Sequence, residues 1–122
     1  MSEKNKMASQ ESIVASTTAA SNTDSVVTIT APATGMTIYI TGLVVSASAA
    51  ITTGGGVAVS VTGTVGGTFS MKLPASAIAP VVLLFGVHPL RITPGVNAVL
   101  TLPALGTNVV GTATLLYYLG AS

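Results

Sequence analysis

The chain is 122 residues long, which is enough for one domain with its own hydrophobic core. Charged residues make up only 6% of it and hydrophobic residues 49%, whereas an ordinary soluble domain is about 25% charged. The sequence contains no cysteine, which excludes disulfides and thiol chemistry, and its net charge of +1 gives no electrostatic reason to expect a nucleic-acid partner.

Residues 1–24 form a polar N-terminal segment that differs from the rest of the chain. The charged residues in it are Glu3, Lys4, Lys6, Glu11 and Asp24. Its only pair of large apolar residues follows Glu11 at positions 13 and 14, so the segment buries too little to fold alone. We therefore expect an extended arm that partners order. No apolar segment follows residues 1–10, so we expect no signal peptide.

From residue 25 onward the apolar residues recur with a period of two, which is the pattern of β-strands. The predicted strands cover residues 27–31, 37–46, 57–62, 69–73, 80–85, 87–92, 96–102 and 108–119. Turn residues separate them, as in Thr93-Pro94-Gly95. Pro89 breaks the strand at 87–92, which suits the edge of a sheet.

This spacing of short strands predicts an all-β fold. We expect a single jelly-roll-like β-sandwich of 7–8 antiparallel strands over residues 25–122, preceded by the extended N-terminal arm at residues 1–24. A membrane span needs about 20 consecutive apolar residues, and the longest apolar runs, at 79–87 and 109–119, are shorter. We therefore expect no membrane partner.

The sequence offers no set of residues for catalysis or metal binding. No Asp or Glu follows Asp24, so the predicted sandwich holds neither a pair of carboxylates nor the acid of a Ser–His–Asp triad. His88 is the only histidine, which is too few for a metal site in a chain without cysteine. We expect a protein that is not an enzyme and has no catalytic, metal or cofactor site.

The two long strands are apolar or neutral on both faces. In 37–46 the alternation places Ile38 and Ile40 on one face, and Tyr39, Thr41, Leu43 and Val45 on the other. In 108–119 the residues Val110, Leu116 and Tyr118 oppose the set of Val109, Ala113 and Leu115. Strands of this kind are covered on both sides, and a chain this small cannot cover them all itself. We therefore predict a homo-oligomer, with a trimer favoured.

Three stretches of the sequence resemble the small jelly-roll proteins that decorate the heads of tailed bacteriophages. These stretches are the strand Ile38-Tyr39-Ile40-Thr41-Gly42-Leu43-Val44-Val45, the turn and strand at 88–100, and the closing strand at 111–120. The resemblance covers about residues 25–120. It implies a virion protein, assembled in the host cytoplasm, that binds the major capsid protein or another virion protein as a decoration or cement protein, often as a trimer, with an arm that reaches neighbours.

The residues expected to contact partners come from the arm, from the isolated charges and from the closing strand. They are Lys4, Lys6, Glu11, Ile13, Val14, Lys72, Arg91, Leu116 and Tyr118. One alternative is a tail, fibre or vertex component that binds a receptor or glycan. Tyr117 and Tyr118 are neighbours in a strand and point to opposite faces, so they do not form one platform for a sugar. Another alternative is a self-assembling surface or matrix protein of a cell, which would require a secretion signal.

Overall fold

The computed structural model describes residues 12–77 and 80–122, and Lys4, Lys6 and Glu11 lie outside these ranges. All regular secondary structure within the described ranges is β-strand. These ranges contain no helix long and apolar enough to cross a membrane. The strands are β1 (Ile13–Thr18), β2 (Ser25–Ile29), β3 (Met36–Ala47), β4 (Val57–Thr62), β5 (Phe69–Leu73), β6 (Val81–Leu84), β7 (Leu90–Arg91), β8 (Ala98–Leu102) and β9 (Gly111–Ala121).

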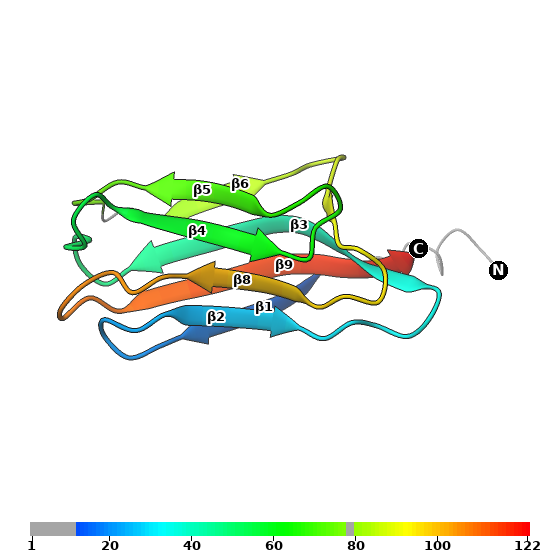
Figure 1. Cartoon of the computed structure of the whole chain (residues 1–122), viewed down its shortest axis with the longest axis horizontal. Coiled ribbons are helices and arrows are strands. Elements are labelled where there is room, and N and C mark those ends of the chain that lie inside the picture. Colours follow the sequence, from blue (N-terminus) through cyan, green and yellow to red (C-terminus); the bar gives the residue numbers. More distant parts are fainter. Residues whose placement is uncertain (1–11, 78–79) are drawn as a thin grey trace.

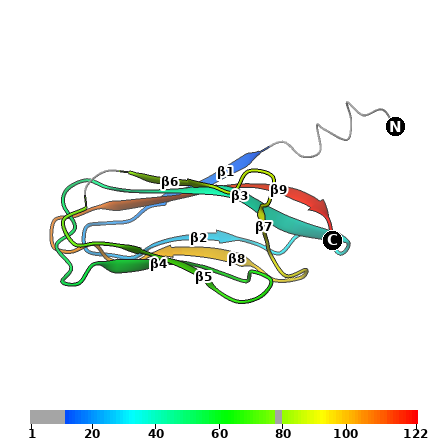
Figure 2. The same cartoon turned by 90° about the horizontal axis from the view of Figure 1, so that it is seen from above.

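The strands form two antiparallel sheets that pack face to face as a sandwich (Figures 1 and 2). One sheet has the order β1-β9-β3-β6, and β7 pairs with β3 beyond the end of β6. The other sheet has the order β2-β8-β4-β5. Apart from the short β7, these eight strands follow the order of a jelly roll, in which the chain passes repeatedly from one sheet to the other. The predicted fold class is confirmed.

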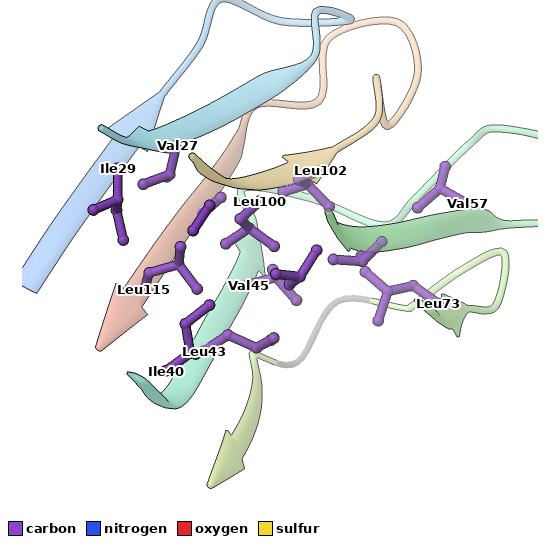
Figure 3. Close-up of a cluster of buried hydrophobic side chains, with 14 of the residues drawn as sticks. Val27, Ile29, Ile40, Leu43, Val45, Val57, Leu73, Leu100, Leu102 and Leu115 are labelled. Carbon is purple, nitrogen blue, oxygen red and sulfur yellow. The ribbon is translucent and has the colours of Figure 1, made fainter. Parts of the chain in front are cut away.

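The core lies between the two sheets and consists of the inward-pointing residues of both (Figure 3). The strand β8 shows the underlying pattern, because Ala98, Leu100 and Leu102 are buried while the residues between them are half-buried. The buried apolar residues are Val27, Ile29, Ile38, Ile40, Leu43, Val45, Ile51, Val57, Val59, Val61, Leu73, Ile92, Ala98, Leu100, Leu102, Leu105, Val109, Ala113 and Leu115. The period of two read from the sequence is therefore the alternation between this core and the two outer faces.

The long strand β3 departs from the alternation expected from its sequence. Leu43 and Val45 were predicted on the face opposite Ile38, yet all three are buried in the same core. The register along β9 shows the cause: Ile40 pairs with Tyr117 and Gly42 pairs with Leu116, so Thr41 is an extra residue. This β-bulge reverses the facing of every residue that follows it. The hydroxyl of Thr41 donates a hydrogen bond of 3.1 Å to the carbonyl oxygen of Leu116, which fixes the bulged residue on its partner strand.

The boundary predicted at residue 24 is wrong for the described part of the arm. Ile13–Thr18 forms β1, whose six residues all pair with β9, from Ile13 opposite Tyr117 to Thr18 opposite Thr112. Ala15 packs against the core from this strand. The segment is polar, but four of its six residues are β-branched, which suits a half-exposed strand. Among the described residues, the sandwich therefore includes Ile13–Thr18, and β1 is the first strand of the jelly roll.

Candidate functional site

The outer face of the β1-β9-β3-β6 sheet carries a row of apolar side chains across all four strands. Val14 of β1 is opposite Leu116 of β9, Leu116 is opposite Gly42 of β3, and Gly42 is opposite Leu84 of β6. Directly opposed residues of antiparallel strands point to the same face. The neighbouring residues in sequence, such as Leu115 and Leu83, point to the core. The row therefore lies on the surface that faces away from the sandwich.

A second row lies beside the first and adds two more valines. Val44 of β3 is opposite Thr114 of β9 on one side and Val82 of β6 on the other. Val82 is 57% exposed, Val14 is 63% exposed and Leu84 is 67% exposed, whereas Val44 and Leu116 are half-buried. We refer to the five residues Val14, Val44, Val82, Leu84 and Leu116 as the apolar band. In a monomer, most of the apolar band would be exposed to solvent.

Gly42 leaves space that two leucines of the band occupy. A Cβ atom at this position would lie 2.9 Å from Cδ2 of Leu84, 3.4 Å from Cδ1 of Leu116 and 3.0 Å from the backbone oxygen of Leu83. Gly42 is itself buried although it is on the outer face. The side chains of Leu84 and Leu116 thus cover Gly42 from the two neighbouring strands, which makes the apolar row continuous from β9 to β6.

Aromatic side chains border the apolar band at one end. Tyr39 and Tyr118 are opposite each other on β3 and β9, and their rings stack with centroids 5.0 Å apart and planes at 15°. The Tyr39 hydroxyl donates a hydrogen bond of 2.7 Å to the backbone oxygen of Ala121. Arg91 of β7 is opposite Tyr39 and is exposed, so the one cation that the described residues place on this face is at its aromatic end.

Hydroxyl groups border the band at the other end. The hydroxyls of Ser16 and Thr114 are hydrogen-bonded at 2.9 Å, and those of Thr18 and Thr112 at 2.8 Å. Both pairs join β1 to β9 on the outer face. These side chains satisfy one another's hydrogen bonds, so this end of the face is polar without being charged.

The outer face of the other sheet has a different character. Its outward residues are Val26, Thr28, Ala58, Ser60, Thr62, Ser70, Lys72, Val99 and Thr101. Hydroxyl side chains predominate there, and Val26, at 41%, is the largest exposed apolar side chain. The two faces of the sandwich are therefore unequal: one is mostly hydroxylated and the other carries the apolar band.

The structure brings together only some of the residues predicted to contact partners. Val14, Leu116 and Tyr118 share the outer face of the β1-β9-β3-β6 sheet, with Arg91 at its margin. Ile13 points to the opposite side from Val14, although it is 41% exposed at the end of its strand. Lys72 is on the other sheet, so the two isolated cations do not form one charged patch.

The prediction that Tyr117 and Tyr118 point to opposite faces is confirmed, since Tyr117 packs against the core and Tyr118 stacks on Tyr39. The sequence interpretation did not single out Val82 and Leu84, which the structure places in the apolar band. The signal was present, because the apolar run at 80–85 has no polar alternate positions, which is unusual for a strand with one face in water.

Residues 12–77 and 80–122 contain no cluster of His, Cys, Asp or Glu that could hold a metal ion. The surface of this part of the chain also shows no pocket. The most distinctive chemical feature of the described residues is thus a flat face rather than a cleft.

No family model matches the chain, and no curated protein is significantly similar to it. One similar solved structure is a CBM4 protein, at 13% identity and a TM-score of 0.41, covering 91% of this chain and 94% of that one. Another comes from the virus-like particle of the extra small virus of the prawn Macrobrachium rosenbergii, at 10% identity and a TM-score of 0.32, covering 88% and 77%. A third is tomato aspermy virus, at 6% identity and a TM-score of 0.30, covering 90% and 78%. At these scores the likeness carries no argument about function, and the jelly-roll assignment is based on the strand order.

Proposed function

We propose that this protein is a non-enzymatic structural component of a virus particle, which binds the capsid as a decoration or cement protein and does so as a homo-oligomer. The observation that carries the proposal is the apolar band, an uncharged surface on a strand-rich face with three strongly exposed members. Burial of apolar surface contributes about 25 cal/mol per Å², and many copies on one lattice multiply this contribution.

The assignment to a capsid comes from the sequence resemblance to phage head decoration proteins. The band supports it because a large contiguous apolar patch on a soluble protein often marks an interaction site. The three charged residues that follow Glu11 are Asp24, Lys72 and Arg91, which is far fewer than a solvated surface usually carries.

The alternative of glycan binding by a tail or fibre component has less support. Its best candidates are Tyr39 and Tyr118, whose rings lie on an exposed face. Each ring, however, already uses one of its two faces to stack on the other, and the Tyr39 hydroxyl is bonded to Ala121. The pair therefore acts as part of the sheet surface rather than as an open stacking platform.

The substitution Leu84→Lys tests the role of the apolar band. Because Leu84 is 67% exposed, the fold should survive, but a lysine would have to be buried without a partner in any contact made by the band. We expect at least about tenfold weaker binding to particles, measured by co-sedimentation. The control is Thr62→Lys, at an exposed position of β4 on the opposite outer face, which should behave like the unmodified chain.

Equal behaviour of the two variants would contradict the role of the band. The virion assignment has its own test, mass spectrometry of purified particles with the tryptic peptide of residues 73–91 as the reporter. We expect copies in fixed proportion to the major shell protein. A handful of copies would favour a tail, fibre or vertex role, and absence from particles would contradict the virion assignment.

A further inference from the structure

We propose that the outer edge of β1 pairs antiparallel with β1 of a second copy, so that two sandwiches join into one continuous eight-stranded sheet around a two-fold axis. This inference rests on the proposed function, because it names the contact through which the copies associate. The edge of a sheet presents a row of backbone N–H and C=O groups that recognise another extended strand. Along β1, one edge pairs with β9, and no strand of the described residues pairs with the other.

The edge strands β1, β2, β5 and β6 differ in how well they resist such pairing. Lys72 lies within β5, the β6 strand has only four residues and follows Pro80, and Asp24 directly precedes β2. Edge strands are usually protected by charge, proline, shortness or bulges. The strand β1 has none of these: Ile13–Thr18 contains no charged residue and no proline, and its register with β9 runs through all six residues without a bulge.

The absence of charge in β1 also favours a second copy as the occupant. When a strand pairs with itself around a two-fold axis, each charged residue is placed near its own copy, and like charges opposed across a sheet destabilise it. The strand β5 would bring two lysines together in this way, whereas β1 places only neutral side chains across the axis. Pairing of this edge with its own copy therefore meets no electrostatic repulsion between like charges.

The position of the apolar band agrees with this pairing. Its first row ends at Val14 on β1, so a two-fold axis perpendicular to the sheet would extend the row into the second copy. The outer faces stay on the same side only if even-numbered residues of β1 oppose even-numbered ones. In that arrangement Val14 of one copy is opposite Val14, Ser16 or Thr18 of the other. Figure 1 shows β1 and β2 along the same side of the sandwich, away from β5 and β6, so the second copy would meet both edges.

Single cysteines test the pairing directly, because the chain has none of its own. The variants are Val14→Cys, Ser16→Cys and Thr18→Cys on β1, each oxidised alone and in equimolar mixtures of two, because a register with Val14 opposite Ser16 bridges only a mixed pair. The control is Ser70→Cys, an exposed outward residue of β5. Opposed Cβ atoms in a sheet are about 4.5–5.5 Å apart, and those of non-hydrogen-bonded pairs come close enough to the about 3.5–4.5 Å of a disulfide for mild oxidation to bridge them. We expect a covalent dimer at one or more of the β1 positions, in about tenfold higher yield than at position 70, and the order of the yields gives the register.

A second variant tests the same contact without cross-linking. Ser16→Lys places two like charges across the axis and should weaken the dimer at least about tenfold in sedimentation velocity, while Ser70→Lys should not. Circular dichroism establishes that both variants are folded. A trimer or other oligomer that persists with no cross-link on β1 would overturn the two-fold pairing and leave the proposed function standing. A chain that stays monomeric, fails to bind particles and forms no cross-link would overturn both.

Discussion

At the scale of single residues, Gly42 shows how the core and the outer face depend on each other. It lies on the outer face, next to the bulge that turns Leu43 and Val45 into the core. Its missing side chain lets Leu84 and Leu116 close over the strand. Gly42 therefore serves two purposes: it follows the extra residue of the bulge, and it makes room for the apolar band.

Replacing Gly42 with alanine should destabilise the fold by about 1–3 kcal/mol. The new Cβ would lie 3.0 Å from the backbone oxygen of Leu83, which cannot move as a side chain can, and this outweighs the entropy that alanine saves in the unfolded chain. Urea unfolding followed by circular dichroism measures the change. The control is Gly54→Ala, where no heavy atom lies within 4 Å of the new Cβ and the free energy of unfolding should change by less than about 0.5 kcal/mol. Equal stability of the two variants would contradict this account of Gly42.

At the scale of strands, β1 is the element whose role differs most from the prediction. It covers one edge of β9, where Ala113 and Leu115 point into the core. Its loss would remove several ladder hydrogen bonds, worth about 1 kcal/mol each, and would expose part of that core. Such a loss is large beside the 5–15 kcal/mol that stabilises a typical domain.

Two deletions separate the strand from the residues before it. Removal of residues 2–11 should leave the free energy of unfolding nearly unchanged, whereas removal of residues 2–18 should abolish cooperative unfolding or cause aggregation, both measured by urea titration. If the shorter chain unfolded as cooperatively and at the same urea concentration as the full chain, β1 would be a dispensable arm, as the sequence alone suggested.

The sequence predicted the strands from β2 to β9 well and missed β1 for an identifiable reason. Alternation between a core and a solvated face leaves a clear period in β4, where Val57, Val59 and Val61 are buried. The strand β1 has little such contrast, since no residue in it is fully buried. The bulge at Thr41 was also not foreseen, although a glycine directly after it is a recognised signal of an irregular strand.

At the scale of the whole molecule, the candidate surface could be predicted only in part. The prediction from composition that a partner covers one face stays a prediction, whereas the alternation along the strand correctly placed Leu116 and Tyr118 on one face. Which other residues join them depends on strand order and register, because Val14, Leu116 and Leu84 are far apart in sequence and neighbours only across three strand pairings. A single sequence does not specify those pairings.

The sparse charge of the molecule leads to a prediction about how its assembly responds to salt. Because neither β1 nor the apolar band contains a charged residue, contacts made through them should be insensitive to screening: self-association should change less than about threefold between 0.05 and 1 M sodium chloride. Ammonium sulfate should strengthen it, because excluded salts favour the burial of apolar surface. Sedimentation velocity over a salt series measures both effects. A steep loss of association with sodium chloride would instead show that charges carry the contact. The same series on the chain lacking residues 2–11 would then reveal whether Lys4, Lys6 and Glu11 are responsible, because the loss would disappear with them.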